Sequence, residues 1–240
     1  MSQVRQSDIR NLLLAGLPPA DFALLAGCLQ PVDFELSQVL HRPDEALKAA
    51  HFPEAGMVSM VATLEDGGLQ EVGVIGREGL VGLAIVMGAD SSPLEALVQG
   101  RGTALRVPAH ALRAAFDRSP ALRAALLRYM QAFHLQVAQT AACNGRHAIE
   151  ERLARWLLIA HDRAGGDRFP MTQEFLAIML GVRRAGVSAA AAVLQKASMI
   201  NYARGHIAVL DRRGLEAASC GCYHAVQRQF DRLLGVAAGG

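Results

Sequence analysis

The residues whose types and spacing point most clearly to a chemistry lie between Thr172 and Arg213. Six Lys or Arg side chains and two acidic side chains occur in this segment. Cationic, hydroxyl and amide groups bind nucleic-acid phosphates, and one guanidinium can donate two hydrogen bonds to a guanine. The segment is therefore a candidate nucleic-acid-binding surface.

Roles can be assigned to single side chains in this segment. Arg184 is the candidate for reading a base. Ser188 is the polar side chain expected at the centre of the helix face that would enter the DNA groove. Alanines on that face would let the backbone approach DNA closely and touch thymine methyl groups. The side chains expected to contact phosphates are Thr172, Gln173, Arg183, Lys196 and Arg204.

Two helices must position these side chains. Thr172 is expected to cap the first helix through its hydroxyl, and Gly181 suits a left-handed C-terminal cap. The second helix is predicted from about Arg183 to Lys196. Its buried stripe should be Val187, Ala191 and Leu194, and its exposed face should carry Ala185, Ser188, Ala189, Ala192 and Lys196.

A small hairpin is predicted directly after the second helix. Residues 200–202 and 206–209 alternate like short strands, and Ala203, Arg204 and Gly205 suit the turn, with Arg204 at its tip. Helix, turn, helix and hairpin in this order are typical of a winged helix-turn-helix, which sets its second helix into the major groove. Two amphipathic helices packed for stability alone are the other interpretation.

The composition of the chain limits the classes of protein to which it can belong. The chain has 240 residues, of which 52% are hydrophobic, and no apolar run approaches the roughly 20 residues that cross a bilayer. No signal peptide opens the chain, so a cytoplasmic protein with no membrane partner is expected. Residues 1–145 carry a net charge of −3 and residues 146–240 carry +5. The basic C-terminal half fits contact with phosphates.

Residues 1–118, the first part of the chain, have a different sequence pattern from the C-terminal part. Short helices are predicted from Ser7 to Leu29, broken at Pro18-Pro19, with Asp21 as a cap. Short apolar runs from about Val32 to Val107, separated by Gly, Pro and Asp, predict an antiparallel β-roll or jelly roll. The segment 65–68, Glu-Asp-Gly-Gly, is a good hairpin turn between two of these runs.

A long helix is predicted over residues 119–145, with Ser119 as its cap, Pro120 at its first position and Asn144-Gly145 at its end. A three–four repeat marks a candidate dimer seam, although packing against the chain's own β-roll would give the same repeat. A further helix follows at about 147–161, within a C-terminal domain of residues 146–240. The predicted fold class of the whole chain is α+β. The residues of the candidate dimer seam on the long helix are Leu122, Leu126, Tyr129, Phe133 and Val137.

The cysteines do not form a disulfide framework and are expected to be free thiols. Cys220 and Cys222, followed by His224, resemble metal ligands, but a fourth ligand and the usual spacing are missing, so no metal and no cofactor are expected. The sequence contains no His-x-His, no Gly-x-Ser-x-Gly and no phosphate-binding loop that ends in Gly-Lys-Ser/Thr. Catalysis is therefore not expected.

In its order of domains the chain resembles the Crp–Fnr superfamily of bacterial transcription regulators. The strongest resemblance is in Arg146-His147, in the stretch Glu151 to Leu157 and in Thr172 through Asp211, and the segment 76–79, Gly-Arg-Glu-Gly, adds to it. The resemblance implies a cyclic-nucleotide-binding-like β-roll, homodimerisation through the long helix and a palindromic site on double-stranded DNA. RNA polymerase and a small-molecule effector are further partners that it implies.

The departures from the family pattern concern the effector. Members that bind cyclic AMP hold it with a Glu after a Gly and with an Arg-Ser or Arg-Thr pair. Here Gly82 is followed by Leu83, and Ser92-Pro93 stands where the pair belongs. Ordinary cyclic AMP binding is therefore not expected, and the effector is unknown. The candidate effector residues are Arg77, Glu78, Gly82 and Arg101.

The sequence shows no clear ligand pattern for two other kinds of sensor, an iron–sulfur cluster and a haem. The N-terminal cysteine cluster of iron–sulfur members is absent, because only Cys28 lies in that region. A haem would need an axial ligand, and the sequence does not select among His51, His110 and His134.

The reading helix departs from the family as well. Members often read bases with Arg, Glu and a second Arg; here Arg184 matches the first, while Ala185 and Ala189 replace the others. DNA shape and phosphate contacts would then supply much of the specificity. The alternative is a sensor or scaffold whose winged helix no longer reads DNA.

Overall fold

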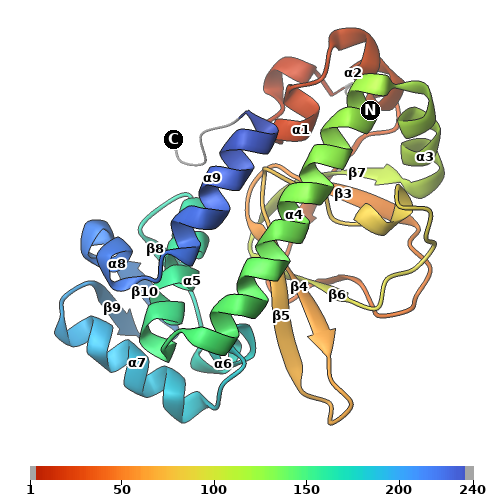
Figure 1. Ribbon diagram of the computed structural model, residues 1–240. Coiled ribbons are helices and arrows are strands. Elements are labelled where there is room, and N and C mark those ends of the chain that lie inside the picture. The colour runs from red at the N-terminus through yellow and green to blue at the C-terminus, as the bar shows by residue number, and fades with distance from the viewer. Residues whose placement is uncertain (1–3, 236–240) are drawn as a thin grey trace.

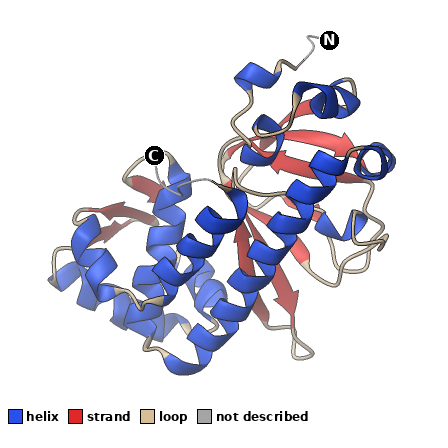
Figure 2. Ribbon diagram, turned by 45° about the horizontal axis from the view of Figure 1, so that its top comes forward, coloured by secondary structure: helices blue, strands red, loops and turns tan. Residues whose placement is uncertain are grey.

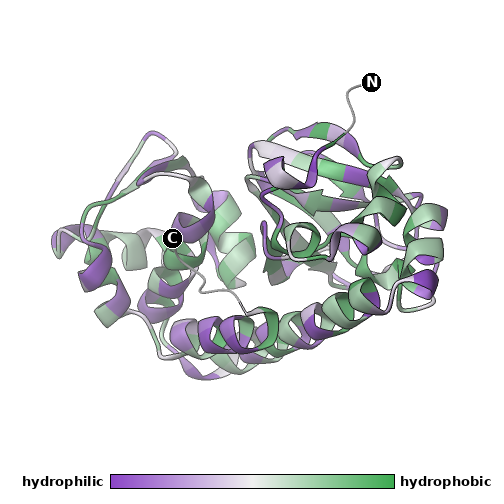
Figure 3. Ribbon diagram, turned by 90° about the horizontal axis from the view of Figure 1, so that it is seen from above, coloured by the Kyte–Doolittle hydropathy of each residue, from purple (hydrophilic) through white to green (hydrophobic). Residues whose placement is uncertain are grey.

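The computed structural model describes residues 4–235, and its central element is the 27-residue helix α4 (Pro120–Arg146), which joins two lobes (Figures 1 and 3). The hydroxyl of Ser119 accepts a hydrogen bond from the backbone N–H of Leu122 at 2.9 Å, and Pro120 occupies the first turn. Both predicted start signals are confirmed. At 1.5 Å per residue the helix is about 40 Å long, so it can connect the lobes.

The N-terminal lobe is the predicted antiparallel β-roll. One sheet has the order β1-β7-β3 and the other has the order β2-β6-β4-β5. The β4–β5 hairpin turns at the predicted Glu65–Gly68 segment, where Leu64 N–H bonds to Gly68 C=O. The strands are β1 (Gln30–Phe34), β2 (Val39–His41), β3 (Ala49–Pro53), β4 (Met57–Thr63), β5 (Leu69–Ile75), β6 (Glu95–Gly100) and β7 (Gly102–Pro108).

Short helices cover the ends of this roll: η1 (Gln6–Asp8), α1 (Leu12–Ala15), α2 (Pro19–Ala26), η2 (Leu83–Ile85) and α3 (Ala109–Arg118). The chain breaks at Pro18-Pro19 as predicted. The prediction that Asp21 caps a helix was wrong, because α2 begins at Pro19 and Asp21 lies inside its first turn. The Asp21 carboxylate instead accepts a hydrogen bond from the Ser119 hydroxyl, which ties α2 to the start of α4.

The predicted dimer seam on α4 is largely buried inside the chain. Leu122 and Leu126 are 0% exposed and Tyr129 is 1% exposed, all within the core of the β-roll. The Tyr129 ring lies against Gly79. Assigning these three side chains to a dimer contact was therefore wrong. Phe133, beside Gly73, and Val137 are only half-buried.

The end of α4 also differs from the prediction, because the helix continues through Asn144-Gly145 to Arg146. The Asn144 side chain accepts a hydrogen bond from Arg152 Nε at 3.1 Å, so it is held by the next helix instead of turning the chain. The extended backbone of His147 ends α4, and α5 (Ile149–Ala164) follows.

The C-terminal lobe is mostly helical, with a small sheet at one edge (Figure 2). The sheet has the order β8-β10-β9, and β8 was not predicted. The core contains Leu153, Leu157, Leu176, Val187 and Leu194. The elements after α5 are β8 (Arg168–Pro170), α6 (Gln173–Leu180), α7 (Arg184–Lys196), β9 (Ile200–Ala203), β10 (His206–Val209), α8 (Arg212–Ala218) and α9 (Cys222–Leu234).

Among the described residues, no single helix is both long and apolar enough to cross a membrane. Helices α6 and α7 reach that length and hydropathy only as a pair, and the pair is bent by 102°.

Candidate nucleic-acid interface

Helices α6 and α7 form the predicted helix-turn-helix. The hydroxyl of Thr172 accepts the backbone N–H of Phe175 at 3.1 Å, and Gly181 ends α6 in the left-handed region at φ 60° and ψ 42°. The angle of 102° between the helices is within the 90–120° range usual for this motif. Both predicted caps are confirmed, and together they set the direction in which α7 leaves the turn.

The two faces of α7 divide as its periodicity predicted. Val187, Ala191 and Leu194 are buried, and Ala190 is buried with them. The sequence pattern missed Ala190 because, in a run of four alanines, residue size does not mark the inner face. Along the outer face Arg184, Ala185, Ala189, Ala192 and Lys196 are exposed, and Ser188 is half-buried.

Gln173, the first residue of α6, holds the predicted base-reading side chain. Its Oε1 atom accepts hydrogen bonds from Arg184 Nε at 3.3 Å and from the Ser188 hydroxyl at 3.0 Å. Arg184 is thereby oriented at the exposed N-terminal end of α7 without a ligand. Pre-ordering an arginine lowers the conformational entropy that it loses on binding.

The wing places Arg204 at its tip, as predicted. Ala203 pairs with His206, so Arg204 and Gly205 form a two-residue turn, with φ of 50° and 74°. Two consecutive left-handed residues are typical of a type I′ hairpin turn. Arg204 is exposed there, in a hollow together with the start of α6 and the start of α7. The hollow is lined by Thr172, Gln173, Arg184, Tyr202, Arg204 and Gly205.

Tyr202 is the one side chain of this hollow that sequence reasoning missed. Strand alternation puts it on the same side as the buried Ile200, so the sequence does not mark it as a surface group. Burial raises the pKa of its hydroxyl, while the charge of Arg184 acts in the opposite direction. The hydroxyl is therefore protonated near neutral pH and can donate a hydrogen bond to a phosphate.

Two predicted phosphate-contacting residues lie outside the hollow. Arg183 is the exposed residue immediately before α7. Lys196 is in the last turn of α7, about 18 Å along the axis from Arg184. Any contact from Lys196 would therefore reach a different part of the duplex.

The hairpin β4–β5 of the N-terminal lobe packs against the C-terminal lobe, which carries the helix-turn-helix and is called the reading lobe below. Gln70 Nε2 donates to the backbone oxygen of Met179 at 3.3 Å. Glu71, which is 4% exposed, accepts hydrogen bonds from Trp156 Nε1 at 2.8 Å and from the Ser59 hydroxyl. Burial raises the pKa of Glu71 to about 7. Glu71 is therefore a carboxyl that titrates near neutral pH at a contact between the two lobes.

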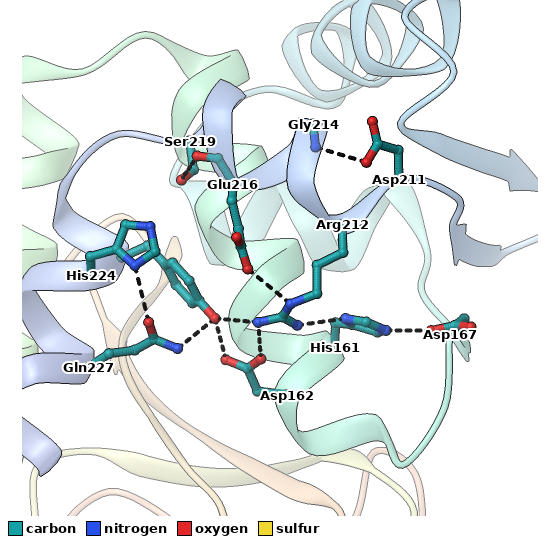
Figure 4. Close-up of polar contacts among 11 residues, drawn as sticks. His161, Asp162, Asp167, Asp211, Arg212, Gly214, Glu216, Ser219, His224 and Gln227 are labelled. Atoms are coloured by element: carbon teal, nitrogen blue, oxygen red, sulfur yellow. Dashed lines mark hydrogen bonds and ion pairs between the residues drawn. The ribbon is translucent and has the colours of Figure 1, made fainter. Parts of the chain in front are cut away.

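A polar network fixes the last two helices to α5 (Figure 4). Arg212 pairs with Asp162 at 2.8 Å and with Glu216 at 3.0 Å. It also donates to the Tyr223 hydroxyl, which in turn donates to Asp162 at 2.9 Å. Helices α8 and α9 are thereby held in a defined position on the reading lobe.

The candidate effector residues are not brought to one place. Arg77 and Glu78 line a cavity of about 250 Å³ between the β-roll, α4, α5 and α9, where Glu78 pairs with Arg163 at 2.6 Å. Gly82 has φ 96° and its backbone lies against Ala50, whereas the exposed Arg101 pairs with Glu35.

The three histidines considered as haem ligands are also dispersed. His51 is on β3, His110 on α3 and His134 on α4, and the last two are exposed. Burial lowers the pKa of His51 to about 4.

The structure groups Cys220 and Cys222 with Cys143 and His147. His224, which the sequence placed with them, is exposed and contacts Gln227 instead. The linear spacing failed to indicate the other two side chains because they come from the end of α4, 73 or more residues earlier in the chain.

Two family models match the chain. A cyclic nucleotide-binding domain matches residues 31–119 and a Crp-like helix-turn-helix domain matches residues 151–218. A search of curated proteins found no match.

Solved structures share the fold over most of their length. FixK2 from Bradyrhizobium japonicum has a TM-score of 0.69 and 18% identity, covering 80% of this chain and 98% of FixK2. TTHB099, a CRP-family regulator from Thermus thermophilus, has a TM-score of 0.66 and 18% identity, covering 86% and 98%. The c-di-GMP-responsive regulator CLP from Xanthomonas campestris has a TM-score of 0.64 and 15% identity, covering 80% and 99%.

The two family models cover the β-roll and the helix-turn-helix. The observed fold of both parts agrees with these models. This chain belongs to the Crp–Fnr superfamily of transcription regulators, which are not enzymes.

Proposed function

We propose that the protein is a sequence-specific DNA-binding regulator that acts as a homodimer on a palindromic site. The observation that carries this proposal is the hollow between α6, α7 and the wing. There Arg184, held by Gln173, and Arg204 face the same open space. Arg184 would read a guanine, and Arg183, Arg204, Thr172 and Gln173 would contact phosphates on either side.

The dimer seam proposed here is a different face of α4 from the one predicted. Its members repeat at alternating spacings of three and four, which is the heptad pattern of paired helices. Leu127 on this face is 49% exposed, so its side chain is free to pack against the same helix of a partner. The seam consists of Ala124, Leu127, Gln131, His134 and Ala138, all exposed.

Ordinary cyclic AMP is not the effector that we propose. Leu83, at the position of the family's ribose-binding Glu, packs against the apolar core of the roll. The Ser92 hydroxyl, near the place of the Arg pair, accepts the backbone N–H of Leu94. Neither group supplies the charge that a buried phosphate needs.

We place the effector at the cavity lined by Arg77 and Glu78, because a ligand there would touch both lobes. A signal changes DNA binding only if it favours one pose of the lobes over another. Contact with RNA polymerase stays a prediction.

The test is the substitution Arg184→Ala, with Arg118→Ala, an exposed arginine at the end of α3, as the control. DNA selected by the wild-type protein from a random pool and unselected DNA are titrated by fluorescence anisotropy. We expect Arg184→Ala to weaken binding of selected DNA by about 1–3 kcal/mol per base contact, with a smaller loss on unselected DNA. Arg118→Ala should leave both affinities unchanged. Equal losses on both DNAs would contradict a base-reading role.

A further inference from the structure

Four side chains with metal-binding atoms meet where α4 ends. Cys143 lies in the last turns of α4 and His147 follows that helix, whereas Cys220 lies in the connection between α8 and α9 and Cys222 is the first residue of α9. Their sulfur and nitrogen ligand atoms all lie within 4.8 Å of one another. The sulfur atoms of Cys143 and Cys220 are 3.4 Å apart, and Cys222 Sγ is 3.5 Å from His147 Nδ1.

We propose that these four side chains bind one zinc ion. Three thiolates and one imidazole are a usual ligand set of structural zinc sites. Two sulfurs bound at about 2.3 Å to one tetrahedral ion lie about 3.8 Å apart, so the observed separations require shifts of about 1 Å or less. An iron–sulfur cluster would hold its thiolates further apart, because iron and sulfide ions lie between them. The geometry therefore favours a single ion.

The surroundings suit an anionic metal centre. The three cysteines are 0–4% exposed and His147 is half-buried, so the sulfur atoms are shielded from water. Gln139 Nε2 donates to Cys222 Sγ at 3.0 Å, which is the kind of outer hydrogen bond that orients a metal ligand. Three thiolates with one zinc dication carry a net charge of −1. The buried Arg152 and Arg155 both interact electrostatically with Cys143 and would offset that charge.

The position of the site gives the ion a mechanical role. Helix α9 runs alongside α4 (Figure 1). The contacts of Gln139 with Cys222 and of Cys143 with Cys220 place the site where the start of α9 meets the end of α4. The same place is the junction at which α4 passes into the reading lobe. A bound zinc ion would cross-link α9 to α4 and fix the reading lobe at the end of the long helix.

The test uses the full-length protein, expressed in zinc-supplemented medium and purified under nitrogen. Elemental analysis should find about one zinc per chain. Protein in which cobalt(II) replaces zinc should show the strong visible bands of tetrahedral cobalt together with thiolate-to-cobalt charge transfer. The cobalt spectrum needs no variant, so it tests the proposal even if the cysteine variants fail to fold.

Matched variants then assign the ligands. Cys143→Ser, Cys222→Ser and His147→Ala should each lower zinc content by at least half or change the cobalt spectrum. Cys28→Ser, which changes the cysteine outside the cluster, and His224→Ala, which changes the nearest histidine in sequence to Cys222, should retain one zinc per chain.

Three results would overturn the proposal. The first is zinc below one tenth per chain together with no tetrahedral cobalt spectrum. The second is a disulfide between Cys143 and Cys220 in protein prepared under nitrogen, shown by a mass two hydrogens lower. The third is iron and acid-labile sulfide in place of zinc. None of these results bears on DNA binding, so the site and the proposed function are tested separately.

Discussion

Replacing Glu71 by Gln should make the protein clearly more stable at pH 8 and should add less than about 1 kcal/mol at pH 5. The Glu71 carboxyl is buried between β5 and α5, where it contacts Ser59 and Trp156. Glutamine keeps the size and the hydrogen-bonding capacity of the side chain but cannot ionise. The comparison therefore isolates the cost of a buried negative charge.

The magnitude follows from the pKa of Glu71, which burial raises from 4.5 to about 7. Between these two values the folded chain binds more protons at this site than the unfolded chain, so the free energy of unfolding falls as pH rises. The fall is complete above pH 7 and amounts to about 3 kcal/mol, at 1.36 kcal/mol per pKa unit. Glu71→Gln should lack this fall.

The assay is urea unfolding at pH 5 and at pH 8, followed by tryptophan fluorescence. Trp156 is the only tryptophan in the chain, and it donates a hydrogen bond to Glu71. We expect Glu71→Gln to exceed the wild type by about 3 kcal/mol at pH 8. The control is Glu65→Gln in the exposed turn of the same hairpin, which should follow the wild type. Parallel pH profiles for Glu71→Gln and the wild type would refute the reasoning.

Three further predictions concern other parts of the molecule. Burial lowers the pKa of His51 to about 4, so this side chain should contribute a loss of stability as pH drops from 6.5 to 4, opposite in sign to the contribution of Glu71; in urea unfolding, His51→Gln should therefore gain stability relative to the wild type over this range, and parallel profiles would contradict this. Thr172→Ala should cost about 1 kcal/mol of unfolding free energy through the lost N-terminal cap of α6, whereas Thr172→Ser should cost much less; equal losses would exclude the capping role. Cyclic AMP at 1 mM should leave the melting temperature and DNA affinity unchanged, and calorimetric binding with micromolar affinity would show that the Leu83 argument fails.

Local signals in the sequence were enough to predict most of the elements. Caps act over three or four residues, so Ser119, Thr172 and Gly181 could be assigned their roles directly. Helical periodicity likewise identified the inner face of α7, apart from Ala190. The reading surface was predictable because most of its side chains come from one continuous segment.

Features made by distant parts of the chain were not predictable in the same way. The stripe of Leu122, Leu126 and Tyr129 has the same three–four repeat whether it packs on a partner or on its own β-roll. Glu71 reads as a polar residue of a strand until α5 covers it. The cysteine and histidine cluster needs the end of α4 and the start of α9 to meet, and linear spacing gives no sign of that meeting.

The salt dependence of binding to selected DNA tests the central claim most directly. Arg183, Lys196 and Arg204 are the three cations per protomer expected to contact phosphates, which gives six in a dimer. Counterion release then predicts that log K falls with log salt concentration at a slope of about −5. A random-pool selection with the same protein should return a two-fold symmetric sequence. A slope near zero together with no enriched sequence would contradict the account.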